Sequence, residues 1–277
     1  MKAHGCALVV VVVAMVCVHP GESSAAVLYG VSEDNYLISM ESTAPGSFLA
    51  SRPITGLQSS EKIVGLDYSS TGTLYGLGDS SRLYTISTDT GQATAVGSGQ
   101  FLPTLNGTAF GFDNIPSGAV VISDLGQSLT ISRATGTAIA NPSLPQASHI
   151  SALAYASGSG VLYGIDSLAN TLVTINPVTG TATTIGPLGI DCSRNNGFDI
   201  SDDSGLAYLA SPAASSDPAA NLYQVNLSNG FVTLIGLIGA PGDDVLVRGL
   251  TVAPTPEPAT MLLLVLGGLA LMRRRRK

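Results

Sequence analysis

Between Gly65 and Gly97 the apolar residues recur in short runs broken by polar turns. The runs begin at GLDY, LYGLG, RLYTIS and QATAVG, and each alternates or clusters β-branched and aromatic residues. Gly, Ser, Asp and Thr fill the breaks between them. This combination is typical of strands joined by hairpin turns. The stretch therefore predicts one sheet of four short strands.

The same pattern returns three more times along the chain, beginning at Gly111, Ala152 and Gly197. Repeats of roughly 40 to 50 residues with four strands each are the mark of a β-propeller. In every repeat a leucine of the third strand precedes a turn glycine at a nearly fixed offset, which predicts a hairpin whose glycine takes a positive φ. These pairs are Leu83 and Gly91, Leu129 and Gly136, Leu172 and Gly180, and Leu222 and Gly230.

The two ends of the repeat region supply the missing parts of one more sheet. RGLTVA, at 248–253, matches only a first strand, whereas VLYGVS, at 27–32, matches only a second strand. We therefore predict an all-β propeller of five four-stranded blades, closed by N- and C-terminal strands in one blade, which leaves only short edges. This blade is the least regular, with an expected turn ESTAPG and a fourth strand near SFLASRPI. The alternative is a loose N-terminal strand pair outside the ring.

Composition and charge fit an exported protein. No window from Val27 to Ala253 has helical periodicity, and the chain contains 32 Gly, 15 Pro, no Trp and only 11% charged residues. Residues 27–253 are thus expected to form one all-β domain. Between Val27 and Thr255, six basic residues stand against seventeen acidic ones, a net charge of −11. Because nucleic acids and anionic surfaces require a basic footprint, they are not expected partners.

Residues 1–26 have the organisation of a secretory signal peptide. Lys2 precedes an apolar run from Cys6 to Val18, and Ser24 and Ala26 satisfy the small-x-small rule, so cleavage is predicted after Ala26. Cys192 is then the only cysteine of the exported domain and has no internal disulfide partner. A buried small apolar residue is the preferred interpretation of it, and an intermolecular disulfide is the alternative.

The C-terminus combines a tether, an apolar segment and a basic tail. Residues 254–258 are proline-rich, residues 259–272 are apolar, and residues 273–277 read RRRRK. As a helix, 14 residues span roughly 21 Å, which is short for a hydrocarbon core of about 30 Å. Snorkelling arginines and local thinning of the bilayer would accommodate such a single transmembrane helix. The positive-inside rule then places the tail in the cytoplasm and the propeller outside the inner membrane.

This terminus resembles the PEP-CTERM sorting signal of bacterial exported proteins. The matching residues are Pro256, Glu257 and Pro258, followed by the apolar segment and by Arg273, Arg274, Arg275 and Arg276. The resemblance implies that an exosortase cuts near 256–258 and that the domain is released or transferred to the cell surface or extracellular matrix. A permanent single-pass anchor is the alternative.

The repeat region resembles a domain-of-unknown-function family of exported bacterial proteins. The resemblance rests on repeated LYG, GLDY-like and TGxAT-like stretches, and it covers nearly all of 27–253. The sequence departs from that family in its third blade, where SGAVVISDLGQSLTI lacks the Asp-Arg-containing strand associated with the family. The family name implies no activity.

Three aspartates form the candidate chemistry, because Asp67, Asp113 and Asp199 occupy the same place in three innermost strands. If these strands line the central channel, the carboxylates could hold a hard cation such as Ca²⁺, with Asn114 as a further donor. Alternatively, they could act as the acid and base of a glycoside hydrolase. The preferred hypothesis is structural, with each aspartate capping its following turn by accepting backbone N–H bonds. The other two repeats have Ala154 and Thr251 at this position.

Other catalytic sets are lacking. His149 is the only histidine after the leader and Cys192 the only cysteine, and there is no G-x-S-x-G elbow. The sequence therefore favours a non-enzymatic, exosortase-processed surface or matrix protein without a cofactor. The expected partners are the exosortase-type enzyme, the inner membrane before processing, and an extracellular polysaccharide or protein. A secreted carbohydrate-active hydrolase and a cation-binding propeller remain the alternatives. The identity of the ligand does not follow from the sequence.

Overall fold

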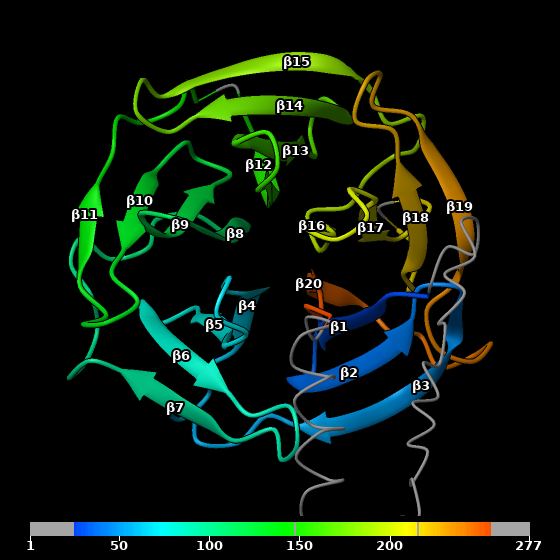
Figure 1. The fold of residues 1–277 in the computed structure, drawn as a ribbon, viewed down its shortest axis with the longest axis horizontal. Helices are drawn as coiled ribbons and strands as arrows, with labels where there is room; N and C mark the ends of the chain where they lie inside the picture. Colours follow the sequence, from blue (N-terminus) through cyan, green and yellow to red (C-terminus); the bar gives the residue numbers. More distant parts are fainter. Residues whose placement is uncertain (1–24, 147, 215, 256–277) are drawn as a thin grey trace, which may run out of the picture.

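The computed structural model describes residues 25–146, 148–214 and 216–255. In that part of the chain, twenty strands form five four-stranded sheets arranged in a ring (Figure 1). The innermost strands are β4 (Ile63–Tyr68), β8 (Phe110–Ile115), β12 (Ile150–Ala156), β16 (Gly197–Ile200) and β20 (Val247–Val252). The second strands are β1 (Val27–Ser32), β5 (Leu74–Gly78), β9 (Gly118–Ser123), β13 (Val161–Asp166) and β17 (Ala207–Ser211). The third strands are β2 (Tyr36–Glu41), β6 (Arg82–Ile86), β10 (Ser128–Ile131), β14 (Thr171–Asn176) and β18 (Asn221–Val225). The outer strands are β3 (Ala44–Pro53), β7 (Ala93–Val96), β11 (Ala138–Ala140), β15 (Thr181–Pro187) and β19 (Val232–Leu237). The predicted five-bladed propeller is confirmed.

The last strand closes the ring against the first. β20 pairs antiparallel with β1, placing Tyr29 opposite Thr251, and the sheet order is β20-β1-β2-β3. The alternative of a loose N-terminal strand pair is therefore wrong. The outer strand of this blade starts at Ala44, earlier than predicted, because a register shift beside Met40 lets Ala44 pair with Glu41 of β2.

The turn glycines take the predicted conformation. Gly91, Gly136, Gly180 and Gly230 have φ values of 75°, 69°, 68° and 86°. The N–H of each donates to the carbonyl four residues earlier, at 2.8 to 2.9 Å. A side chain at such a φ is strained, so these glycines fix the register of the third and outer strands.

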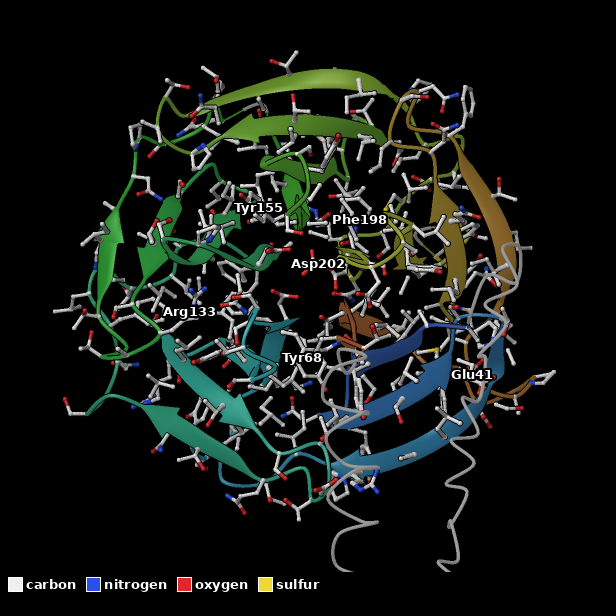
Figure 2. The ribbon with its side chains drawn as sticks, viewed as in Figure 1. Glu41, Tyr68, Arg133, Tyr155, Phe198 and Asp202 are labelled. Carbon is white, nitrogen blue, oxygen red and sulfur yellow. The ribbon has the colours of Figure 1, made fainter. Side chains whose placement is uncertain are left out.

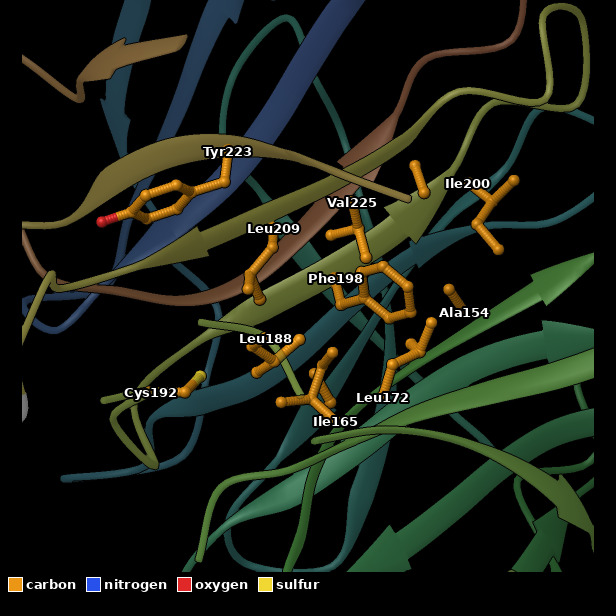
Figure 3. Packing of buried hydrophobic residues seen from close by; sticks show 12 residues of the cluster. Ala154, Ile165, Leu172, Leu188, Cys192, Phe198, Ile200, Leu209, Tyr223 and Val225 are labelled. Carbon is orange, nitrogen blue, oxygen red and sulfur yellow. The ribbon is translucent and has the colours of Figure 1, made fainter. Parts of the chain in front are cut away.

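The hydrophobic core lies between neighbouring blades. In Figure 3, Phe198 of β16 packs beside Leu172 and Ile165 of the preceding blade and Leu209 of its own. Cys192 belongs to the same cluster and is only 2% exposed, as expected for a small buried residue. Tyr84, Tyr208 and Tyr223 are also buried. The core cluster therefore joins residues of neighbouring repeats as well as residues of one repeat.

Close approach of the innermost strands requires glycine. A Cβ added at Gly65 would lie 2.5 Å from the Cβ of Phe112, and one at Gly197 would lie 2.3 Å from the backbone nitrogen of Leu250. Both glycines stand two residues before an aspartate, on the same side of the strand. The innermost strands are thus packed almost backbone to backbone, which brings those aspartates near the axis.

The described chain ends beside the last blade. Thr255 donates through its backbone N–H and its hydroxyl to Asp203, which lies in the turn after β16, at 3.3 and 2.5 Å. The predicted leader up to residue 24, the PEP motif, the apolar segment and the basic tail lie outside the described residues. Within the described residues, no helix has the length and apolar character needed to cross a bilayer.

Candidate functional site at the propeller axis

The three predicted aspartates meet at the axis of the ring. Asp67 on β4, Asp113 on β8 and Asp199 on β16 each place a carboxylate oxygen within 4.8 Å of the others. Their exposed fractions are 5%, 3% and 7%. Tyr68 directly follows Asp67, and Tyr155 directly follows Ala154, which occupies the matching position of its blade. Both tyrosines border the axis in Figure 2, where Asp202 lies near the centre. We call Asp67, Asp113, Asp199 and Thr251 the axial ring.

Each carboxylate of the axial ring accepts a backbone N–H from the innermost strand of the next blade. Asp67 Oδ2 accepts from Asn114 at 2.8 Å, and Asp113 Oδ2 accepts from Tyr155 at 3.0 Å. Asp199 Oδ2 accepts from Val252 at 2.6 Å. In every case the donor stands one residue after the position that matches the aspartate. The carboxylates therefore join neighbouring blades where their innermost strands end.

Thr251 continues the series in the closing blade, since its hydroxyl accepts from the N–H of Tyr68 at 3.2 Å. Only the fourth blade breaks it, because Ala154 has no side-chain acceptor. The N–H of Ile200, which would bond there, donates instead to Asp199 Oδ1 at 2.6 Å. Four of the five blade junctions thus carry the same hydrogen bond.

The prediction that each aspartate caps its own turn is wrong. Two of the turns are held by serines: the N–H of Thr73 donates to Ser69 Oγ, and the N–H of Ser204 donates to Ser201 Oγ, both at 3.2 Å. Because a serine two residues after the aspartate already serves each of these turns, the carboxylate points towards the next blade. The hydrogen bonds of these carboxylates therefore run between blades.

The hydrogen bonds of Thr251 require a proton on one of the carboxyl groups. Its Oγ1 lies 2.9 Å from Asp67 Oδ1 and 3.0 Å from Asp199 Oδ2, yet a hydroxyl has one proton to donate. Asp199 Oδ2 already accepts from Val252 and is suited to accept again. Protonated Asp67 Oδ1 donating to Thr251, which donates to Asp199, satisfies all three groups. In this arrangement Thr251 links the carboxyl groups of Asp67 and Asp199 by hydrogen bonds.

Electrostatics favours the same protonation. Burial raises the pKa of Asp67 well above its usual value, and the neighbouring charge of Asp113 raises it further. Burial likewise raises the pKa values of Asp113 and Asp199, with added repulsion from Asp199 and from Asp67, respectively. No basic residue pairs with the three aspartates among the described residues, so protons relieve the repulsion.

We expect Asp113→Asn to flatten the pH dependence of stability. Because the folded pKa values exceed the unfolded value of about 3.9, the stabilising contribution of these carboxyls is complete below that value and falls as pH rises through the folded values. The introduced amide cannot ionise, and its oxygen still accepts from Tyr155. At pH 8 the variant should be more stable than wild type by about 1 kcal/mol or more. Urea unfolding from pH 4 to pH 8 measures this, with exposed Asp89→Asn as the control; equal slopes for wild type and Asp113→Asn would contradict it.

The three carboxylates are close enough together to hold a metal ion, the calcium alternative, but most of their neighbours are hydrogen-bond donors. Ca²⁺ takes six to eight oxygen ligands, whereas several carboxylate oxygens here already accept N–H or O–H groups. Asn114, the predicted further donor, directs its NH₂ at the carbonyl of Asp67 at 3.2 Å, and its Oδ1 accepts from Arg133 at 3.4 Å. Asn114 thus holds the axial ring from outside and is not placed as a ligand of it.

The other potentially reactive residues are not joined into a catalytic set. Cys192 Sγ lies 3.4 Å from Ser211 Oγ and accepts from Asn196 at 3.2 Å, and burial raises the pKa of its thiol. The backbone carbonyl of His149 accepts from Ser167. Thr251 is the member of the axial ring that sequence reasoning missed, although its place at the matching repeat position was the available signal.

Comparison with known proteins agrees with this architecture. The PEP-CTERM protein-sorting motif matches residues 254–277. Comparison with curated proteins gives no match. A Bacteroides caccae protein of unknown function aligns over 84% of this chain and 100% of its own, with a TM-score of 0.54 and 10% identity, which supports the fold alone. A chain of a nidogen/laminin complex aligns over 83% of this chain and 98% of its own, with 12% identity and a TM-score of 0.48. The family model described as domain of unknown function DUF4394 matches residues 36–251, and the chain therefore belongs to that family.

Proposed function

We propose that this protein is a non-enzymatic binding or structural component of the bacterial cell surface or extracellular matrix. Its sorting motif implies export, anchoring in the membrane before processing, and cleavage by an exosortase. The final location and the binding role are the proposed part. A partner would be an extracellular polysaccharide or another protein of the envelope or biofilm.

The observation that carries the non-enzymatic role is the use made of the axial carboxylates. A glycoside hydrolase needs two carboxyl groups open to substrate, about 5 to 10 Å apart. Here Asp67, Asp113 and Asp199 are no more than 7% exposed, lie within 4.8 Å of one another, and hydrogen-bond to backbone N–H groups of neighbouring blades. These groups are engaged in joining the blades, so the proposal includes neither catalysis nor a cofactor.

Two measurements test the absence of catalysis and of a cation. Wild type and an Asp67→Asn/Asp199→Asn variant, assayed on a panel of bacterial polysaccharides, should release no more reducing sugar than buffer does. Hydrolysis by wild type that is lost in the variant would support the hydrolase instead.

Ca²⁺ should leave the thermal midpoint unchanged at pH 7, since a ligand that binds only the folded state raises it. A calcium-dependent rise that disappears in Asp113→Asn would support the cation-binding alternative.

Replacing the sorting motif should abolish processing. In the native bacterium, we expect wild type to be found mainly as a shortened form outside the inner membrane. The triple variant Pro256→Ala/Glu257→Ala/Pro258→Ala should remain at full length in the membrane fraction, because the exosortase recognises that motif. Fractionation with mass spectrometry of the C-terminus measures this.

The matched control for that experiment is Pro254→Ala, which alters a proline of the same tether outside the three-residue motif. It should be processed like wild type. If the triple variant is shortened and released as efficiently as the control, processing through this motif is disproved. If both remain in the membrane, a permanent anchor is the better description.

A further inference from the structure

A groove opens at the end of the propeller opposite the axial ring. It has a volume of about 360 Å³ and lies between the turn that joins β1 to β2, the strands β2 and β3, and the connection from β19 to β20. That connection passes beside β3 in Figure 1. Small-molecule pockets of proteins have volumes of about 300 to 1,000 Å³. We call this the acidic groove; its lining residues are Ser32, Glu33, Asp34, Tyr36, Ile38, Phe48, Ser51, Asp243, Asp244, Val245 and Leu246.

The lining combines carboxylates with an apolar wall and has no basic residue. The half-buried Phe48, Val245 and Leu246 provide the apolar surface, with the buried Ile38 behind them, and Tyr36 adds an aromatic ring that is 43% exposed. The four acidic side chains come from two segments that are about 200 residues apart in the sequence. The groove therefore offers an apolar surface beside concentrated negative charge.

Only one of the four carboxylates has a cationic partner. Glu33 pairs with Arg248 at 2.5 Å. Among residues 25–146, 148–214 and 216–255, no ion pair involves Asp34, Asp243 or Asp244. Asp243 accepts the backbone N–H of Ala240 at 2.9 Å, which leaves its charge in place. The ammonium of Lys62 donates to the backbone carbonyl of Glu33 at 3.2 Å, beside Asp34, but among the described residues it forms no ion pair with the three aspartates.

The walls of the groove are fixed by hydrogen bonds. Asn35 takes a φ of 59° in the turn, donates to the carbonyl of Glu61 at 2.9 Å and accepts from the N–H of Ile63 at 2.9 Å. The N–H of Glu33 donates to the carbonyl of Leu246 at 3.0 Å, which joins the two sides. The N–H of Ala220 holds Val245 in the same way, at 2.8 Å. A ligand would therefore meet a preformed site and have little to order on binding.

We propose that the acidic groove binds a basic segment of a partner protein. An arginine or lysine side chain of that segment would place its aliphatic stem against Phe48 and Val245 and its cationic head near Asp34 and Asp244, with Tyr36 available for a cation–π contact. A bare divalent cation would leave the apolar wall unused, and a neutral glycan would leave the charges unpaired. The inference assigns a partner class to the proposed binding role and rests on it.

The test uses residues 25–255, because all five blades close within 27–252. The probe is a fluorescent, acetylated and amidated tetra-arginine peptide, followed by anisotropy in 20 mM and 500 mM NaCl, with a tetra-glutamate peptide for comparison. We expect saturable binding of the arginine peptide only, weakened by salt. Asp34→Asn/Asp244→Asn should lower the affinity about tenfold, since two charge contacts are lost. Asn tolerates the φ of 48° at Asp244, so the fold is preserved.

The matched control is Glu41→Gln/Asp89→Asn, which removes two exposed charges outside the groove and should leave binding within about twofold. Tyr36→Ser should weaken binding severalfold without changing the net charge. An equal loss in the control would mean attraction by the overall charge and would overturn the proposal. Displacement of the peptide by stoichiometric CaCl₂, or no binding at low salt, would overturn it as well. None of these outcomes alters the hydrolysis and fractionation results, so failure of this inference is separable from failure of the proposed function.

Discussion

Replacing Gly197 by alanine is expected to destabilise the propeller by about 3 kcal/mol or more. The new methyl group would lie 2.3 Å from the backbone nitrogen of Leu250 and 2.5 Å from the carbonyl carbon of Gly249. Both are backbone atoms of β20, which cannot move aside as a flexible side chain can. β16 and β20 would have to separate, which also stretches the bond from the Val252 N–H to Asp199. Urea unfolding at pH 5 measures the loss.

Gly158→Ala provides the control, because a Cβ at that position meets no atom within 4 Å and its φ is not positive. It should change the free energy of unfolding by less than about 0.5 kcal/mol. If Gly197→Ala is equally neutral, the innermost strands are not packed as tightly as the structure indicates. If it fails to fold, the thermal midpoint of the milder Gly65→Ala variant gives the comparison, since its contact is with the side chain of Phe112.

Thr251→Val is expected to cost about 2 to 4 kcal/mol although the two side chains have nearly the same shape. The hydroxyl is the acceptor for the N–H of Tyr68 and the link between Asp67 and Asp199. Valine leaves the N–H of Tyr68 without that acceptor. It also removes the hydroxyl between Asp67 and Asp199, so that no donor separates their carboxyl groups. Thermal and urea unfolding of the purified domain measure the effect.

Thr251→Ser separates the role of the hydroxyl from that of the methyl group. Serine keeps the oxygen and should recover most of the stability, losing about 1 kcal/mol for the deleted methyl. A serine variant as unstable as the valine variant would show that packing of the methyl group, and not hydrogen bonding, explains the loss. Equal stability of all three proteins would remove Thr251 from the axial ring.

The blades could be predicted from the sequence because each is built from local signals. Each alternating strand and each turn glycine, such as Gly91, lies within a single repeat. The incomplete repeats at the two ends of the domain contain the complementary strands of one more blade. The contacts of the axial ring could not be predicted in the same way. Asp67 bonds to Asn114, which is 47 residues away, and a local interpretation assigned the carboxylate to the nearest turn. The acidic groove was missed for a related reason, because Asp34 and Asp244 are adjacent only once β20 has joined β1.

The place where the described chain leaves the ring bears on how an anchored form of the protein would face the membrane. β20 ends at Val252 beside the axial ring, and Thr255 is held there by Asp203. From Thr255 to the first residue of the apolar segment, Ala259, four peptide units reach at most about 14 Å. If the segment 259–272 anchors the protein before processing, as its sequence predicts, we expect the end with the axial ring to face the bilayer and the acidic groove to face away from it. Cleavage near 256–258 would then take place close to the end that carries the axial ring, and the opposite end would be the one open to a partner.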